Sequence, residues 1–175
     1  NNPLIIGYFI ANEQRYSDLL RRLSQFRSDR AAKRELARYL TRLYPDIHSF
    51  NRAWNCRLKS NDQLADTVLT VKTEQALRDM KPFVEQFLER YFQVIRTTFR
   101  KYDPNHLLLG ARFLPAVTRE LESAVSICGR HVDVFSINYY SNEIDSEYLA
   151  SLHQLSGRPL LLSEWSFGTA EQGLT

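Results

Sequence analysis

The stretch VDVFSINYYSNEIDSEYLASLHQLSGRPLLLSEW, residues 132–165, decides the fold. Two apolar, β-rich runs, residues 132–139 and 159–165, flank residues 145–155, whose apolar positions have helical spacing. Gly157 follows this helix, as glycine often does at a helix C-terminus. A strand, a helix and a second strand in this order are typical of a βαβ unit, in which the two strands are parallel.

The same alternation extends toward the N-terminus. Residues 106–113 (HLLLGARF) form a further apolar run, and residues 117–129 form the next predicted helix. Residues 73–101 predict a long helix with one apolar face, and Pro82 predicts a break or a kink near residues 80–81. Residues 3–11 (PLIIGYFIA) are apolar on both alternating faces, which predicts a strand buried on both sides.

The helical patterns between the first two strands form an insertion. Residues 29–44 predict a helix capped by Asp29 and ended by Pro45, and residues 46–54 and 60–67 predict shorter ones. The later strand ends lie about 25 residues apart, as expected for βα units. The sequence therefore predicts an α/β fold: a partial (β/α)8 TIM barrel of about four parallel βα units. We expect residues 1–175 to be one domain, with a helical insertion at about 14–80; a complete barrel usually needs ~250 residues.

Composition places the chain among soluble globular domains, at 43% hydrophobic and 25% charged residues. The longest mainly apolar run, residues 4–11, is too short to span a bilayer. No signal peptide is visible. Both ends resemble cuts through a longer protein; the alternative is a small complete domain that has lost a tag or signal.

Charge, cysteine and histidine spacing narrow the function. Residues 15–42 carry nine Lys/Arg against three acidic residues, within a net charge of +3. Such a segment is usually a solvated helix face, and without a nucleic-acid-binding motif it predicts no nucleic-acid partner. Cys56 and Cys128 lack metal-site spacing and are free thiols or one disulfide, and the four histidines form no closely spaced pair. We expect neither a metal nor a cofactor.

Polar and aromatic residues end all four predicted strands, where ligands bind in parallel α/β folds. Glu13 follows the first strand and Glu164 ends the fourth. Two carboxylates on one barrel rim suit glycoside hydrolysis, in which one protonates the leaving oxygen and the other attacks the anomeric carbon. The alternative is that Glu13 caps the next helix and Glu164 pairs with a surface arginine. The other candidates at these ends, which suit sugar binding, are Asn12, Arg112, Asn138, Tyr140 and Trp165.

These strand ends resemble a known family. IIGYFIANE (5–13) is similar to the fourth strand of glycoside hydrolase clan A, and LLLSEW (160–165) to the seventh. YDPNHLLLGARF (102–113) and VDVFSINYYS (132–141) resemble strands five and six of β-agarase and β-galactosidase-like members. The tail SEWSFGTAEQG (163–173) is similar to the segment after their nucleophile.

The resemblance implies a role for each site residue. Glu13 would be the general acid/base and Glu164 the nucleophile of a retaining β-glycosidase, while Asn12 would bind the 2-hydroxyl of the sugar. Tyr140 would orient Glu164, or else be a rim aromatic with a solvated hydroxyl. Arg112 and Trp165 would contact sugar, or else form a structural ion pair and pack in the core. Asn138 is placed with the substrate-binding residues.

The implied substrate is a β-linked poly- or oligosaccharide, first of all a galactose-containing one such as agar, with no membrane partner. The alternative is a non-catalytic carbohydrate-binding or assembly module on a truncated barrel. Strands one to three and eight have no counterpart here, which would leave two exposed sheet edges. We therefore expect either that two copies pair or that the rest of the parent chain completes the barrel. A periplasmic or extracellular location is slightly favoured.

Overall fold

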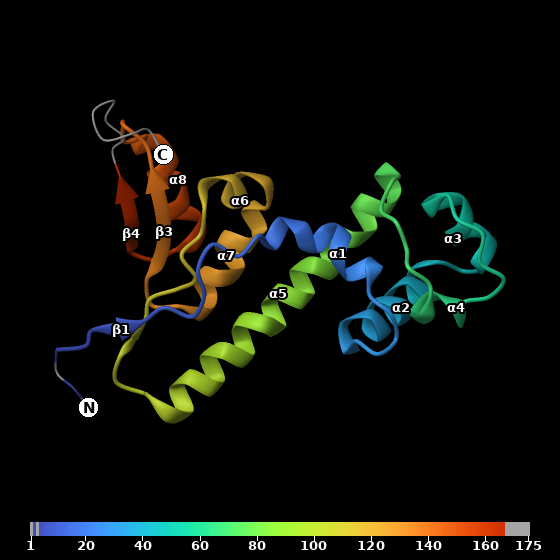
Figure 1. Ribbon diagram of the computed structural model, residues 1–175, viewed down its shortest axis with the longest axis horizontal. Helices are drawn as coiled ribbons and strands as arrows, with labels where there is room; N and C mark the ends of the chain where they lie inside the picture. The colour runs from blue at the N-terminus through green and yellow to red at the C-terminus, as the bar shows by residue number, and fades with distance from the viewer. Residues whose placement is uncertain (1, 3, 167–175) are drawn as a thin grey trace. The chain divides into compact units, whose positions relative to one another are not determined.

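A computed structural model describes residue 2 and residues 4–166 of the chain (Figure 1). The chain divides into two compact units. One combines the residues up to Tyr16 with those from Leu88 onward, and the other is Ser17–Phe87. The final part of the agarase-like tail, residues 167–173, lies outside the described residues.

The strands of the first unit pair in parallel. β1 (Gly7–Tyr8) pairs with β2 (Leu107–Leu108), and β3 (Phe135–Tyr140) pairs with β4 (Leu160–Ser166). A single parallel bridge, between Phe113 and Ile137, joins the segment after β2 to β3. The pairings therefore follow the order of the chain from β1 to β4.

The strands β1 and β2 are shorter than the sequence predicts, although backbone hydrogen bonds continue to join the two segments beyond the strand ends. Ile10 N–H donates to the Gly110 carbonyl at 3.1 Å, and Glu13 N–H donates to the Arg112 carbonyl at 3.1 Å. Gly110, Arg112 and Glu13 have φ angles of 92°, 48° and 54°, which lie in the left-handed region. These three residues interrupt the extended backbone at the ends of the strands.

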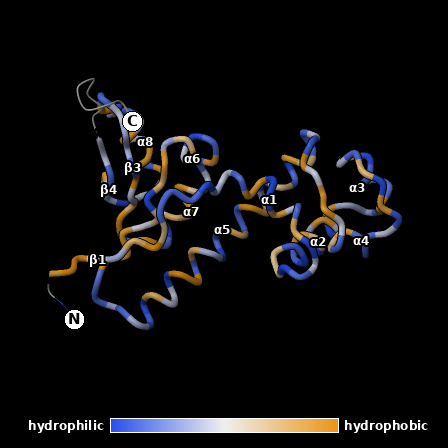
Figure 2. Tube along the Cα trace, viewed as in Figure 1, coloured by the Kyte–Doolittle hydropathy of each residue, from blue (hydrophilic) through white to orange (hydrophobic). Residues whose placement is uncertain are grey.

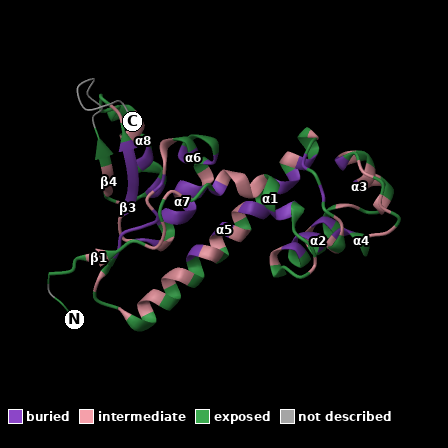
Figure 3. Cartoon of the chain, in the orientation of Figure 1, coloured by how far each residue is buried: buried purple, intermediate pink, exposed green. Residues whose placement is uncertain are grey.

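Burial differs between the central and outer strands (Figure 3). β3 is buried from Phe135 to Tyr139, whereas Leu4 and Ile6 near β1 are 88% and 71% exposed. The prediction that residues 3–11 are buried on both sides is wrong for the described chain. A parallel strand is buried on both faces when helices cover both faces of its sheet, and β1 is an edge strand here, paired with β2 alone among the described residues.

Three helices follow the strands of the first unit: α6 (Pro115–Glu120), α7 (Glu122–His131) and α8 (Ser146–Ser156). The single helix predicted over 117–129 is instead divided at Leu121, a buried residue with non-helical backbone angles. Helix α8 agrees closely with the prediction. The Asp145 side chain accepts from Tyr148 N–H at its start, and Gly157 ends it in the left-handed conformation.

Helix α5 (Glu74–Tyr102) runs without interruption through Pro82, so of the two predicted outcomes the break at residues 80–81 is wrong, and the kink stays a prediction. A proline inside a helix removes one backbone hydrogen bond and crowds the preceding turn. Met80, Phe83 and Val84 are buried on either side of it, and their packing holds the helix together at this point. Figure 2 displays the alternation of apolar and polar residues along α5.

The second unit contains α1 (Leu19–Gln25), α2 (Ala31–Leu43), α3 (Ile47–Trp54) and α4 (Gln63–Asp66). A 3₁₀ turn, η1 (Tyr16–Asp18), precedes them. The prediction that Asp29 caps the helix over 29–44 is wrong: α2 starts after Arg30, with no side-chain cap. The Asp29 carboxylate pairs with the Arg30 side chain instead, at 3.4 Å.

A fully buried lysine in α2 forms hydrogen bonds with two neighbouring segments. The Lys33 ammonium donates to the carbonyl of Ser24 at 2.7 Å and to that of Thr67 at 2.8 Å. Burial away from water lowers the pKa of Lys33 to about 8, and the negative charge of Asp66 partly opposes this. Lys33 is therefore the exception in the basic segment 15–42, which otherwise carries exposed arginines and a few exposed ion pairs.

Candidate active site

Side chains from the ends of all four strands meet at one edge of the first unit. Glu13 lies beyond β1 and Arg112 beyond β2, while Asn138 and Tyr140 are in β3 and Glu164 is in β4. Residues 13 and 164 are 151 positions apart in the sequence, so the parallel pairing of the strands is what brings them together.

Asn138 is the buried centre of this group. Its side-chain Nδ2 donates to Glu13 Oε1 at 2.9 Å and to Asn12 Oδ1 at 3.2 Å. Its Oδ1 accepts from the Ser163 hydroxyl at 2.8 Å. Asn138 is 0% exposed. Each of its polar atoms is thus occupied by protein, so the structure gives this predicted substrate-binding residue the geometry of a support for Glu13.

Tyr140 connects the two carboxylates. Its hydroxyl contacts Glu13 Oε1 at 3.3 Å and also donates to Glu164 Oε2. The hydrogen bond to Glu164, with some desolvation and the negative charge of that carboxylate, raises the pKa of Tyr140 to about 12. The phenol therefore stays protonated near neutral pH and can donate. Since one hydroxyl contacts an oxygen of each carboxylate, those two oxygens are at most about 6 Å apart at ordinary hydrogen-bond lengths.

Arg112 faces Glu164. Its Nη2 donates to Glu164 Oε1, and its guanidinium lies over the ring of Phe9 with 5.0 Å between Cζ and the ring centroid. Only 20% of the Arg112 side chain is exposed, against 37% of Glu164. Of the two interpretations of Arg112, the ion pair is the one the structure contains. The guanidinium places a positive charge beside the carboxylate and orients it.

A β-bulge brings Ser163 and Glu164 to the same face. Ile137 pairs with Leu162 and Asn138 pairs with Glu164, so Ser163 is an extra residue in β4. Consecutive residues of a regular strand point to opposite faces, yet Ser163 contacts Asn138 while Glu164 contacts Tyr140. Bulges are common beside active sites, where they redirect a side chain. The sequence pattern alone gave no indication of the bulge, and Ser163 was missed for that reason.

Trp165 follows Glu164 in β4. It pairs in register with Tyr139, whose ring stacks with Tyr148 of α8 on the other face of the sheet. Trp165 and Tyr139 line a cavity of about 280 Å³, together with Ser141, Ile144 and Leu162. A sugar contact by Trp165 would therefore be made from this cavity, and it stays a prediction.

Comparison with known proteins supports the resemblance to β-agarases that the sequence analysis describes. No protein-family model matches the chain. The chain is similar to β-agarases. It is 26% identical to Beta-agarase B of Vibrio sp. (strain JT0107) and 26% identical to Beta-agarase A of the same organism. Each match covers 99% of this chain and 19% of the agarase, so the chain spans about a fifth of the length of these curated relatives.

Solved structures agree in backbone arrangement. The structure of PfGH50B matches 97% of this chain with a TM-score of 0.79 and 26% identity, over 26% of its own length. An exo-beta-agarase matches 96% with a TM-score of 0.78 and 25% identity, over 24% of its length. The resemblance to β-agarases is thus supported by sequence and by structure, whereas membership of clan A and the β-galactosidase-like character remain inferences from the residues.

The described residues also bear on metal binding, membrane insertion and cysteine reactivity. Among the described residues, no group of three or more His, Cys, Asp or Glu could hold a metal ion, and no helix is both long and apolar enough to cross a membrane. Cys56 and Cys128 are free, and Cys128 is buried. Burial raises the pKa of both thiols, which makes them poor nucleophiles near neutral pH.

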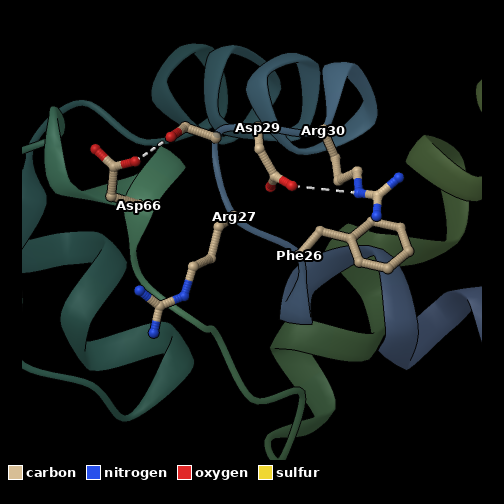
Figure 4. Close-up of a pocket in the computed structure, with 6 residues that line it drawn as sticks. Phe26, Arg27, Asp29, Arg30 and Asp66 are labelled. Atoms are coloured by element: carbon tan, nitrogen blue, oxygen red, sulfur yellow. Dashed lines mark hydrogen bonds and ion pairs between the residues drawn. The ribbon is translucent and has the colours of Figure 1, made fainter.

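The second unit has its own cavity, of about 630 Å³, in front of α2 (Figure 4). Arg27, Asp29 and Arg30 line it, with the ring of Phe26 at one side and Asp66 at the other. Asp29 pairs with Arg30, and Asp66 accepts from the Ser28 hydroxyl. The cavity is therefore lined by charged side chains of both signs.

Proposed function

We propose that this chain is the part of a glycoside hydrolase that carries both catalytic carboxylates, and that the enzyme cleaves β-glycosidic bonds in agarose or a related galactose-containing polysaccharide. The observation that carries the proposal is the Tyr140 hydroxyl, which contacts Glu13 and Glu164 at once. The similarity to β-agarases over 99% of the chain supports the substrate class.

The mechanism we propose is retaining double displacement. Retaining glycosidases hold their carboxyl groups ~5–5.5 Å apart, whereas inverting enzymes keep them ~6.5–9.5 Å apart to admit a water. The upper limit of about 6 Å between the carboxylate oxygens, set by the shared Tyr140 hydroxyl, supports the retaining case. Glu164, beside the Arg112 guanidinium, attacks the anomeric carbon and forms a glycosyl ester. Glu13 protonates the leaving oxygen and then deprotonates the water that hydrolyses the ester.

The fold we propose is four βα units of a (β/α)8 barrel of clan A type, with Ser17–Phe87 as the helical insertion. Parallel pairing from β1 to β4 and the meeting of functional side chains beyond the strand ends support it. The exposed apolar residues beside β1, such as Leu4 and Ile6, suit the docking of a further barrel segment. The relatives are about five times as long, and we propose that the parent chain supplies that segment.

The test uses the complete gene product with agarose as substrate. We expect Glu164→Ala to abolish turnover and Glu13→Ala to lower it about 10²–10⁴-fold, the usual contribution of a general acid/base. Nuclear magnetic resonance of the first product should detect the β anomer, because two displacements restore the starting configuration. A Glu164→Ala protein with near-normal turnover would overturn the assignment. A wild-type protein that binds agarose without cleaving it would favour a binding module.

A further inference from the structure

Ser163 occupies a position that the proposed mechanism has not used. It is the extra residue of the β4 bulge and comes immediately before the proposed nucleophile. Its hydroxyl donates to Asn138 Oδ1 at 2.8 Å and lies 3.3 Å from the Ile137 carbonyl. Through Asn138 it therefore reaches Glu13, the proposed acid/base on the opposite side of the site.

The orientation of the Asn138 amide decides whether Glu13 faces a hydrogen-bond donor or an acceptor. As the structure has it, the amide NH₂ faces Glu13 Oε1, and the amide oxygen faces Ser163. Turned by half a rotation, the amide would present its oxygen to Glu13 and could accept a hydrogen bond from the carboxyl proton that a general acid must deliver. A buried amide oxygen needs a donor, and Ser163 supplies one on the side away from Glu13.

The two carboxylate oxygens of Glu13 therefore differ in their hydrogen-bond partners. Oε1 accepts from Asn138 and lies within reach of the Tyr140 hydroxyl, whereas within the described part of the chain no donor is recorded for Oε2. Donors that occupy Oε1 leave the acidic proton on Oε2. That oxygen is the one available to the leaving group of the sugar.

We propose that Ser163 is a positioning residue: its hydroxyl holds the Asn138 amide so that the NH₂ group faces Glu13, and the proton of Glu13 stays on the oxygen that serves the leaving group. The inference rests on the proposed glycosidase function. The bulge is what makes the arrangement possible, because a regular strand would turn Ser163 away from Asn138.

The experiment compares two leaving groups in the complete gene product. Phenyl and 2,4-dinitrophenyl β-glycosides of the sugar that the wild-type cleaves are assayed for kcat/KM, which reports the first irreversible step. Dinitrophenolate leaves without a proton, whereas phenolate needs one from Glu13. For Ser163→Ala we expect kcat/KM on the phenyl glycoside to fall about tenfold or more, part of the 10²–10⁴ that a general acid supplies. The dinitrophenyl glycoside should stay within about twofold.

Matched variants separate positioning from general damage. Ser163→Thr keeps the hydroxyl on a residue suited to strands and should restore the phenyl activity, and Ser163→Cys, a weak donor, should be intermediate. Ser151→Ala, on the exposed surface of α8, serves as the control and should behave as wild type. If Ser163→Ala misfolds, the Cys variant carries the comparison.

Failure of this inference differs from failure of the proposed function. Equal losses on both glycosides, or none, in a folded Ser163→Ala or Ser163→Cys protein would overturn the role of Ser163 while cleavage that depends on Glu13 and Glu164 persists. A wild type without cleavage, or one indifferent to Glu164→Ala, would overturn both.

Discussion

Replacing Arg112 by methionine tests the charge arrangement around Glu164. The variant keeps an unbranched apolar stem but removes the guanidinium whose Nη2 donates to Glu164 Oε1. A hydrogen bond to a charged group contributes about 1.5–3 kcal/mol. Water reaches Glu164, whose side chain is 37% exposed, so we expect the lower half of this range. At about 1.4 kcal/mol per tenfold, the rate of nucleophilic attack should fall about 10- to 40-fold.

The assay isolates attack by Glu164. A 2-deoxy-2-fluoro glycoside with a good leaving group traps the glycosyl-enzyme, so its inactivation rate reports nucleophilic attack independently of the acid. Arg112→Lys keeps one positive charge without the planar fork and should lie between wild type and Arg112→Met. Arg119→Met, which removes an exposed arginine of α6, is the matched control. Inactivation of a folded Arg112→Met protein at the wild-type rate would refute the reasoning.

Two further predictions concern stability. The Lys33 ammonium should lose its proton in the folded protein at about pH 8, while in the unfolded chain it keeps it to about 10.5. Between these pH values the free energy of unfolding of the wild type should therefore rise by up to about 3 kcal/mol relative to that of Lys33→Met, in which the other buried groups titrate alike. Trp54 fluorescence during denaturation would follow this, and parallel wild-type and variant curves would contradict it. Gly129→Ala should lower the melting temperature, because an added Cβ would lie 2.1 Å from the Ser156 carbonyl oxygen. Overpacking of this kind costs about 1–3 kcal/mol, whereas Ser126→Ala in the same helix should be near neutral, and an unchanged Gly129→Ala melting curve would contradict the close contact.

Periodicity and capping were sufficient for the elements that local interactions determine. Helix α8 has a capping aspartate at one end and a left-handed glycine at the other, so its bounds could be predicted closely. Pro82 does not break the long helix α5, because buried packing around it outweighs the loss of one hydrogen bond. The division of the next helix at Leu121 had no sequence signal.

The strand ends show more clearly what could and could not be predicted from the sequence. Continuous apolar runs that end in polar residues indicated where each strand ends, and together with the family resemblance they were enough to nominate Glu13, Asn138, Tyr140 and Glu164 as neighbours. They could not indicate that Asn138 would be fully buried, because burial depends on which side chains from other segments, here those of Asn12, Glu13 and Ser163, close over it. Its contacts are with protein groups, and the prediction that it binds sugar stays a prediction.

The geometry of the site depends on irregular backbone that residue types do not reveal. Glu13 and Arg112 have left-handed φ angles of 54° and 48°, and Ser163 is an extra residue in its strand. Glu13 is itself one of the two carboxylates, and Arg112 contacts the other, Glu164. Ser163 precedes Glu164 and contacts Asn138, which donates to Glu13. Non-glycine residues in such conformations cost about 1–3 kcal/mol each and persist where the surroundings enforce them. Substituting glycine at Arg112 should thus relieve backbone strain while removing the Glu164 contact, so a gain in stability with a loss of turnover would separate the two effects at one position.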